Sequence, residues 1–222
     1  MTEPLDSAKA RVVIVEDHPM FRERLALLIN RENDMMVCGE ADNARDGLSL
    51  IQRIKPQIAI VDISLRGSGG LDLIKDLRAQ EIDVPVLVLS MHEESLYAER
   101  VIRAGAKGYI TKHEASAKVM IAIRQVLRGE IYLEAQAMSK LVHKMVAGVP
   151  ADPAKPIARL TDRELEVFEL IGLGRTTREI GAQLHVGLTT VDTYRARIKE
   201  KLQLENASRL HSEASRWVQE RG

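Results

Sequence analysis

The segment Gln57-Ile-Ala-Ile-Val-Asp62 is an apolar run of strand length that ends in an aspartate. It lacks the strict alternation of apolar and polar residues that a half-exposed strand shows. Four similar runs rich in Val and Ile lie on either side of it, at residues 11–16, 35–41, 84–90 and 107–110. Strands buried on both faces and separated by helices are typical of a parallel sheet, so residues 10–130 are predicted to form a doubly wound α/β domain with a five-stranded parallel sheet.

The stretches between these strands have helical period and carry helix-start signals. Pro19 suits the first turn of a helix over 19–30, and Asn43 is the expected N-cap of a helix over 43–55. Three more helices are predicted at residues 70–79, 95–104 and 116–128. A further helix at 135–145 either extends this domain or leads into a linker, and the sequence leaves both open.

A change of composition separates the two halves of the chain. Three prolines lie within residues 150–156, too many for a helix or a central strand, so residues 131–156 are read as a helix and a Pro-rich linker. Residues 157–222 have an almost wholly helical pattern, with predicted helices at 161–172, 177–184, 189–202 and 207–220. The capping boxes Thr161-Asp-Arg-Glu164 and Thr176-Thr-Arg-Glu179 mark two helix starts and predict a small all-α domain.

The amino-acid composition excludes several classes of protein and of binding site. The 222 residues carry 32 basic and 32 acidic side chains, so net charge gives no general nucleic-acid signal and any such signal must be local. The lone cysteine, Cys38, excludes an intramolecular disulfide, and the six histidines lack zinc-site spacing. With no apolar stretch of transmembrane length and no signal-peptide pattern, we expect a cytoplasmic protein.

Polar side chains follow the predicted strands where ligands bind in an open parallel sheet. Glu16 and Asp17 follow the first strand, Asp62 and Ser90 end two others, and Lys112 follows the fifth. Carboxylates held close together repel one another unless a cation neutralises them, and a donor set made only of oxygen atoms suits Mg²⁺. An aspartate beside that ion can act as a nucleophile toward a phosphoryl group. Each residue alone is more simply a loop opener or a cap, so only the constellation carries this interpretation.

Residues 10–130 resemble the receiver domain of two-component response regulators, which has a flavodoxin-like fold. The resemblance lies in Val15-Glu-Asp-His-Pro19, Ile60-Val-Asp-Ile-Ser-Leu-Arg-Gly67, Leu87-Val-Leu-Ser-Met-His92 and Gly108-Tyr-Ile-Thr-Lys112. It implies that Asp62 accepts a phosphoryl group from a histidine kinase. It further implies that Mg²⁺ is held by Glu16, Asp17, Asp62 and the Ser64 carbonyl, and that the phosphoryl-binding and switch residues are Ser90, Tyr109 and Lys112.

Two residues depart from the receiver pattern. Arg66 replaces the usual proline before the glycine, and Ser90 replaces the more frequent threonine. Neither change removes a catalytic group. Ser64 and His92 stand at positions that in this family tune the lifetime of the acyl phosphate.

The C-terminal helices have the pattern of a helix, a turn and a second helix with basic residues. The turn is His185-Val-Gly-Leu188, and the helix over 189–202 carries four basic residues within seven positions. This arrangement places a recognition helix in the major groove of DNA. On residues alone, a solvated charged face of a four-helix domain explains the pattern equally well.

Residues 157–222 resemble the LuxR-type helix-turn-helix of NarL/FixJ response regulators, through Leu160-Thr-Asp-Arg-Glu-Leu-Glu-Val167 and Arg178-Glu-Ile-Gly-Ala-Gln-Leu184. The resemblance implies DNA contacts by Thr189, Thr190, Asp192, Thr193, Arg195, Ala196, Arg197, Lys199 and Lys201. Gly187, Asp192 and Tyr194 depart from the family's usual serine, lysine and histidine. The Asp192 carboxylate repels phosphate but can accept a hydrogen bond from cytosine, so it is expected to change the preferred site rather than to abolish binding.

Together these features predict a phosphorylation-dependent transcription regulator that binds promoter DNA as a homodimer and is no enzyme beyond its own phosphorylation and dephosphorylation. Two alternatives remain at this point. A phosphatase with an aspartyl-phosphate intermediate would need a general acid where Ser64 stands, and an atypical regulator would never use phosphate. Dimerisation could use the receiver, the last helix, or both. The stripe of Leu210, Ala214 and Trp217 on that helix is equally consistent with domain core.

Overall fold

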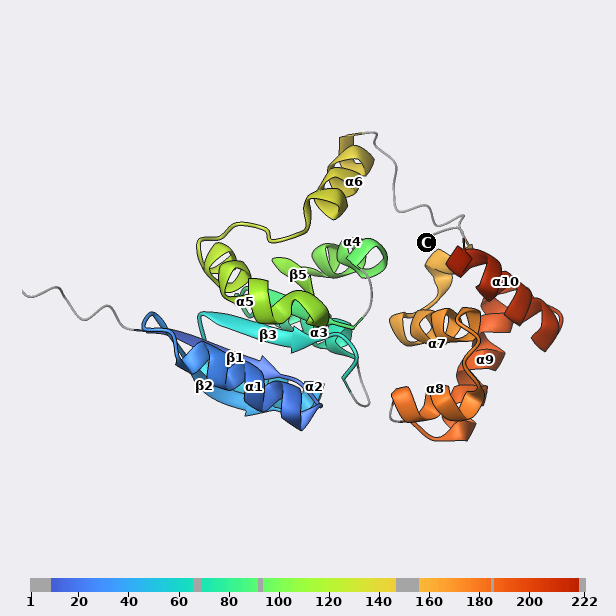
Figure 1. Cartoon of the computed structure of the whole chain (residues 1–222), viewed down its shortest axis with the longest axis horizontal. Helices are drawn as coiled ribbons and strands as arrows, with labels where there is room; N and C mark the ends of the chain where they lie inside the picture. The colour runs from blue at the N-terminus through green and yellow to red at the C-terminus, as the bar shows by residue number, and fades with distance from the viewer. Residues whose placement is uncertain (1–8, 66–68, 92–93, 147–155, 185, 220–222) are drawn as a thin grey trace, which may run out of the picture. The chain divides into compact units, whose positions relative to one another are not determined.

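The computed structural model describes residues 9–65, 69–91, 94–146, 156–184 and 186–219 (Figure 1). The chain separates into two compact units, Met1–His143 and Lys144–Gly222. Helix α6 (Ala135–Val146) runs across the boundary between these units. Among the described residues, none of the helices combines the length and the apolarity that spanning a bilayer requires.

The first unit is built on a parallel sheet of five strands in the order β2-β1-β3-β4-β5. The strands are β1 (Ala10–Val15), β2 (Met35–Ala41), β3 (Ile58–Asp62), β4 (Val86–Ser90) and β5 (Gly108–Thr111). The order reverses at β1, since the chain runs outward to β2 and then returns to β3 on the other side. The predicted doubly wound sheet is therefore confirmed, with a topological switch point between β1 and β3.

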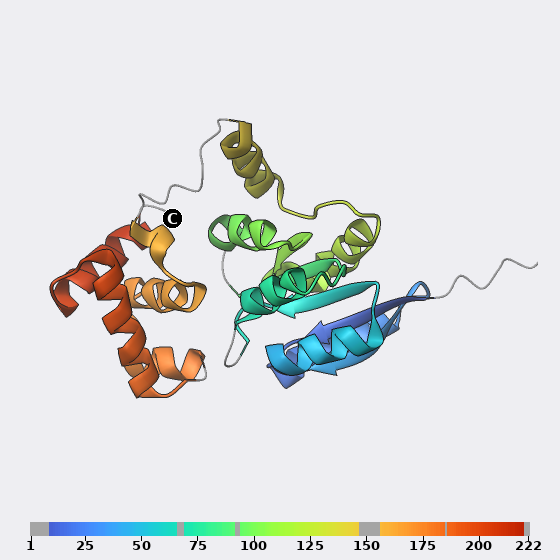
Figure 2. The ribbon, with the colours of Figure 1, turned by 180° about the vertical axis from the view of Figure 1, so that it is seen from behind.

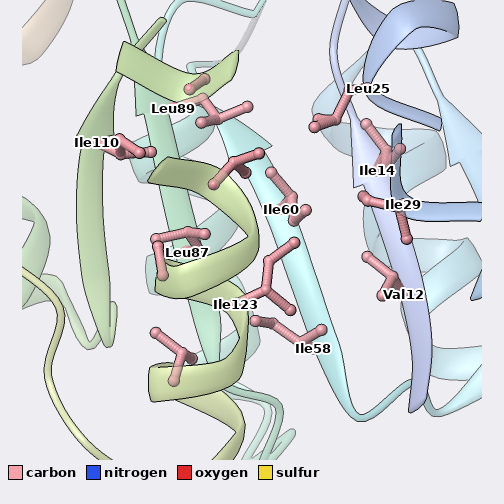
Figure 3. Close-up of a cluster of buried hydrophobic side chains, with 14 of the residues drawn as sticks. Val12, Ile14, Leu25, Ile29, Ile58, Ile60, Leu87, Leu89, Ile110 and Ile123 are labelled. Carbon is pink, nitrogen blue, oxygen red and sulfur yellow. The ribbon is translucent and has the colours of Figure 1, made fainter. Parts of the chain in front are cut away.

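Helices cover both faces of the sheet (Figures 1 and 2). They are α1 (Pro19–Asn30), α2 (Ala44–Ile54), α3 (Gly70–Ala79), α4 (Glu94–Ala104) and α5 (Lys112–Leu127). Helices α1 and α5 pack on one face, where alternate strand residues such as Ile14, Ile60 and Leu89 meet Ile29 and Ile123 (Figure 3). Burial of both faces explains why the strand sequences do not alternate in polarity.

The main difference from the predicted elements is the start of α5. The sequence predicts this helix over 116–128, but it begins at Lys112, directly after β5. Thr111 is the N-cap, with extended backbone, and its hydroxyl donates a hydrogen bond to the Glu114 carboxylate in the first turn (3.0 Å). The early start fixes Lys112 at the carboxyl edge of the sheet.

Past α5 the chain returns to the outer edge of the sheet. The Tyr132 N–H donates to the Lys107 carbonyl (2.9 Å), and the Tyr109 N–H donates to the Tyr132 carbonyl (3.0 Å). Tyr132 thus forms an isolated parallel bridge with Gly108. The bridge covers part of the β5 edge, which would otherwise present unpaired backbone groups.

The second unit is helical, as predicted. A short 3₁₀ helix, η1 (Pro156–Arg159), precedes α7 (Asp162–Gly172), α8 (Thr177–Gln183), α9 (Leu188–Leu202) and α10 (Ala207–Gln219). Both predicted capping boxes are present, at Thr161 with Glu164 and at Thr176 with Glu179. Helix α9 begins one residue earlier than expected, because Gly187 serves as its N-cap.

The apolar face of α10 packs into the core of this unit. Leu210 and Ala214 are fully buried, and the Trp217 ring lies 5.5 Å from the Phe168 ring of α7. The sequence left this stripe open as either domain core or dimer surface. The structure places Leu210 and Ala214 in the core, while Trp217 is half-buried.

A close backbone approach at the start of α3 yields the first prediction. A Cβ atom on Gly70 would lie 2.0 Å from the Asp62 carbonyl oxygen and 3.0 Å from the Ile63 Cα, and backbone atoms cannot yield without moving β3. We expect Gly70→Ala to lower the free energy of unfolding by about 1–3 kcal/mol, measured by urea denaturation.

The neighbouring glycine supplies the control. A Cβ on Gly69 would lie 3.4 Å from its nearest atom, the Ile63 carbonyl oxygen, which is an ordinary contact. Gly69→Ala is expected to cost less than about 1 kcal/mol, the scale of an N-cap change. Equal losses in the two variants would contradict the close approach at Gly70.

Candidate functional site

The sequence-predicted carboxylates meet at the carboxyl edge of the sheet, beside the switch point. Glu16 and Asp17 follow β1, and Asp62 is the last residue of the neighbouring strand β3. All three side chains are almost completely buried. Together with His18, each offers a potential ligand atom, and these atoms all lie within 4.8 Å of one another.

Lys112 joins two of these carboxylates. Its Nζ lies 2.9 Å from Asp62 Oδ2 and 2.7 Å from Glu16 Oε2, and it also lies 4.9 Å from the centre of the Phe21 ring. The ammonium is buried, so it can remain charged only with such partners. Because α5 starts at Lys112, a side chain far along the sequence is held against residues of β3 and the β1 end.

Burial, reinforced by the neighbouring Glu16 carboxylate, raises the pKa of Asp62 to about 6. The Lys112 ammonium and the Ser64 N–H, which donates to Asp62 Oδ1 (3.1 Å), oppose this rise. Burial on its own would lower the pKa of Lys112, but the two carboxylates outweigh it and raise that pKa. Three carboxylates against one ammonium leave the site with excess negative charge and oxygen donors, which suits a divalent cation.

His18 is a member of the site to which the sequence interpretation assigned no role. Its Nδ1 lies 3.0 Å from Glu16 Oε1 and 2.9 Å from Asp17 Oδ1, and its backbone N–H also donates to Glu16 Oε1 (3.0 Å). The available signal was its position directly between the acidic pair and Pro19, which begins α1. His18 therefore helps to orient the carboxylates.

Two more predicted receiver residues lie on the neighbouring strands β4 and β5. Ser90 is the last residue of β4, pairs in register with Thr111 and is fully buried. Tyr109 lies in β5 and is also fully buried. Arg66 and His92, two positions singled out in the sequence, lie outside the described residues.

A second candidate surface lies on α9. Val191 and Ile198 are buried and turn one side of the helix into the core. Six of the residues expected to contact DNA are exposed on the other side: Thr189, Thr190, Asp192, Thr193, Ala196 and Arg197. The other three, Arg195, Lys199 and Lys201, are half-buried.

Two of the four basic residues on α9 bind side chains of other helices in the same unit. Lys201 Nζ lies 2.6 Å from Glu164 Oε2, an oxygen that also accepts the Thr161 N–H of the α7 capping box. Burial acts to raise the pKa of Glu164, but these bonds overcome it and hold the pKa below its ordinary value.

Arg195 is held in a similar way by two other helices. It donates to Thr177 Oγ1 on α8 and lies 3.2 Å from His211 Nε2 on α10. No ion pair of Arg197 or Lys199 is found among the described residues, so these two cations are the ones available for phosphate.

Comparisons with known proteins found matches to both halves of the chain. Residues 12–124 match the response regulator receiver domain, and residues 158–214 match the luxR family of bacterial regulatory proteins. The oxygen regulatory protein NreC of Staphylococcus aureus is 31% identical over 204 residues, which cover 90% of this chain and 94% of that protein.

Two solved structures are similar in fold. A LuxR-family two-component response regulator from Aurantimonas is 30% identical, with a TM-score of 0.58, over 63% of this chain and 99% of that one. RcsB from Salmonella enterica serovar Typhimurium, solved bound to the promoter rprA with the phosphomimetic BeF3⁻, gives a TM-score of 0.58 at 22% identity, over 93% of this chain and 98% of that one. The match of both halves means that the chain belongs to the two-component response regulators that join a receiver domain to a LuxR-type DNA-binding domain, and that it is a transcription regulator.

Proposed function

We propose that Asp62 accepts a phosphoryl group from a sensor histidine kinase and that this event controls the binding of α9 to promoter DNA. The observation that carries the proposal is the placement of Asp62. It ends the central strand β3 at the switch point, with the Lys112 ammonium 2.9 Å away and the Glu16 carboxylate on the same ammonium. A nucleophile and a cation for the transferred group thus stand together.

The donor set at this edge fits Mg²⁺. The side-chain oxygens of Glu16, Asp17 and Asp62 lie close enough to share one ion, and the Ser64 carbonyl is a further proposed ligand. When bound, the ion would neutralise charge on the phosphoryl oxygens. Carboxylates that would otherwise repel one another would be stabilised by the same ion.

Several residues of the chain have separate roles in the proposed phosphoryl transfer. An Asp62 carboxylate oxygen attacks the phosphorus, so that a P–O bond forms as the P–N bond to the kinase imidazole breaks. Lys112 stabilises charge on the phosphoryl oxygens, and the Ser90 hydroxyl at the end of β4 donates to one of them. Tyr109, in the neighbouring strand β5, is the proposed switch residue through which the receiver face changes.

The proposed organisation is a receiver at 10–130, a helix and linker at 131–156, and a DNA-binding domain at 157–222. Phosphorylated chains form a homodimer on promoter DNA in the cytoplasm, and the receiver catalyses only its own phosphorylation and dephosphorylation. A phosphatase would need a general acid two residues after Asp62, and Ser64 cannot serve as one. The phosphate-independent regulator is an outcome of the following test.

The test of the proposal is Asp62→Asn, which keeps the shape of the side chain but removes the nucleophile. The full chain is incubated with an acyl-phosphate donor and Mg²⁺, and its intact mass and DNA affinity are measured at fixed salt. We expect wild type to gain one phosphoryl group and to bind DNA more tightly, and Asp62→Asn to do neither. Removal of Mg²⁺ by EDTA should abolish the gain.

Asp76→Asn on the exposed side of α3 is the matched control and should behave as wild type. Wild type and Asp62→Asn with equal DNA affinity, and no phosphate on either, would establish the phosphate-independent regulator instead.

Lys112→Met tests the role of the buried ammonium in phosphoryl transfer. Without the ammonium, charge on the transferred group loses its stabilisation, so the initial rate of phosphorylation should fall by on the order of 10²- to 10³-fold. The rate is followed by intact mass with a saturating acyl-phosphate donor. Lys107→Met, an exposed lysine just before β5, should leave the rate unchanged, and an equal rate in Lys112→Met would refute the role of the ammonium.

Two lysines on α9 test which of its cations contacts DNA. Lys199→Met should weaken binding to all sequences and reduce the slope of log affinity against log salt by about 1. Lys201→Met should instead lower the free energy of unfolding by about 1.5–3 kcal/mol, because the buried Glu164 carboxylate loses a charged donor. Salt titrations and urea denaturation of both variants decide the assignment, and the reverse pattern would contradict it.

A further inference from the structure

The exposed face of α9 is chemically divided along its length. Its first two turns present hydroxyl groups and one carboxylate but no cation: Thr189, Thr190, Asp192 and Thr193. Arg197 and Lys199, the cations of α9 with neither an ion pair nor a side-chain hydrogen bond among the described residues, lie in the second half. In a helix-turn-helix the N-terminal part of the recognition helix faces the base edges, so the half of α9 without cations is the half that reads sequence.

Asp192 is the strongest acceptor on this half of the helix, and its carboxylate is exposed to solvent. The nearest cation one turn along, Arg195, is turned toward Thr177 and His211. Asp192 has no ion pair or hydrogen bond with any side chain in the part of the chain that the structure describes. It also lies beyond the first turn, where a carboxylate would stabilise the helix dipole.

The hydroxyl of the neighbouring residue, Thr193, makes a hydrogen bond within the helix. Thr193 Oγ1 donates to the Thr189 carbonyl within the helix (2.8 Å), which leaves its methyl group on the surface. The Asp192 carboxylate is therefore an acceptor held on a rigid element with neither a folding partner nor a competing donor beside it.

The chemistry of base edges selects what such an acceptor can bind. A carboxylate facing the groove is repelled by phosphates, and this cost is offset only by a base-edge donor. Cytosine presents the N4 amino donor, while guanine presents two acceptors and thymine an acceptor and a methyl group. Adenine has an amino donor, but its adjacent N7 acceptor repels a carboxylate.

We propose that Asp192 is a specificity-determining residue that accepts a hydrogen bond from the N4 amino group of one cytosine in each half-site. The inference rests on the proposed docking of α9 in the major groove. Discrimination against another base at that position is about tenfold to 100-fold, as expected for one good side-chain contact to a base edge.

The test is selection from a random double-stranded DNA pool by the full-length chain after incubation with an acyl-phosphate donor and Mg²⁺. Wild type should enrich sequences with cytosine at one position of each half-site. Asp192→Asn should change that position to adenine, because an amide pairs with adenine N6 and N7. Asp192→Ala should lose the preference there and keep it at every other position.

Glu200→Gln is the control, since Glu200 is an exposed carboxylate two turns further along the same helix. It removes the same charge and should leave the selected sequence unchanged. If wild type and Asp192→Ala select the same sequence and differ only by a uniform change in affinity, Asp192 is a surface charge and the inference is overturned. If wild type enriches no sequence, the proposed function fails, and the inference fails with it.

Discussion

The structure of the first unit depends on the ion pairs that the buried Lys112 ammonium makes with Glu16 and Asp62. Buried carboxylates this close together repel one another strongly, and a single ammonium 2.7–2.9 Å away is what makes the arrangement tolerable. The ion pairs join the end of β1, the end of β3 and the start of α5. They are possible only because apolar residues on both faces of the sheet bring these three points to one edge.

In the second unit, a buried carboxylate also pairs with a lysine, and here the ion pair joins two helices. Glu164 closes the capping box of α7 and at the same time accepts from Lys201, so that one oxygen connects the first and third helices of the unit. Arg195 makes a similar connection to α8 and α10. Half of the cations on α9 therefore hold the helix in place, and a count of basic residues overstates its phosphate-binding surface.

Much of the fold could be predicted from the sequence, because local rules decide where many strands and helices begin and end. Runs such as 57–62 predict buried strands, and the Thr161 and Thr176 capping boxes mark helix starts that the structure confirms. The sequence was less informative where distant contacts decide. The ion pairs of Lys112 depend on Glu16 and Asp62, and the ion pair of Lys201 depends on Glu164 of α7. His18 was missed because its contacts with Glu16 and Asp17 depend on the backbone conformation between β1 and α1, which no residue pattern specifies.

Net charge limits how the proposed switch can work. The chain carries equal numbers of acidic and basic side chains, so long-range attraction to DNA is weak before any modification. A phosphoryl group on Asp62 would replace a carboxylate of charge −1 by an acyl phosphate of about −1.5 to −2, so the site would become more negative by up to about one charge at neutral pH. Tighter DNA binding after phosphorylation therefore cannot come from charge attraction. It has to come from geometry, through assembly of two recognition helices on one site or through release of α9, and sequence choice then depends on short-range base contacts.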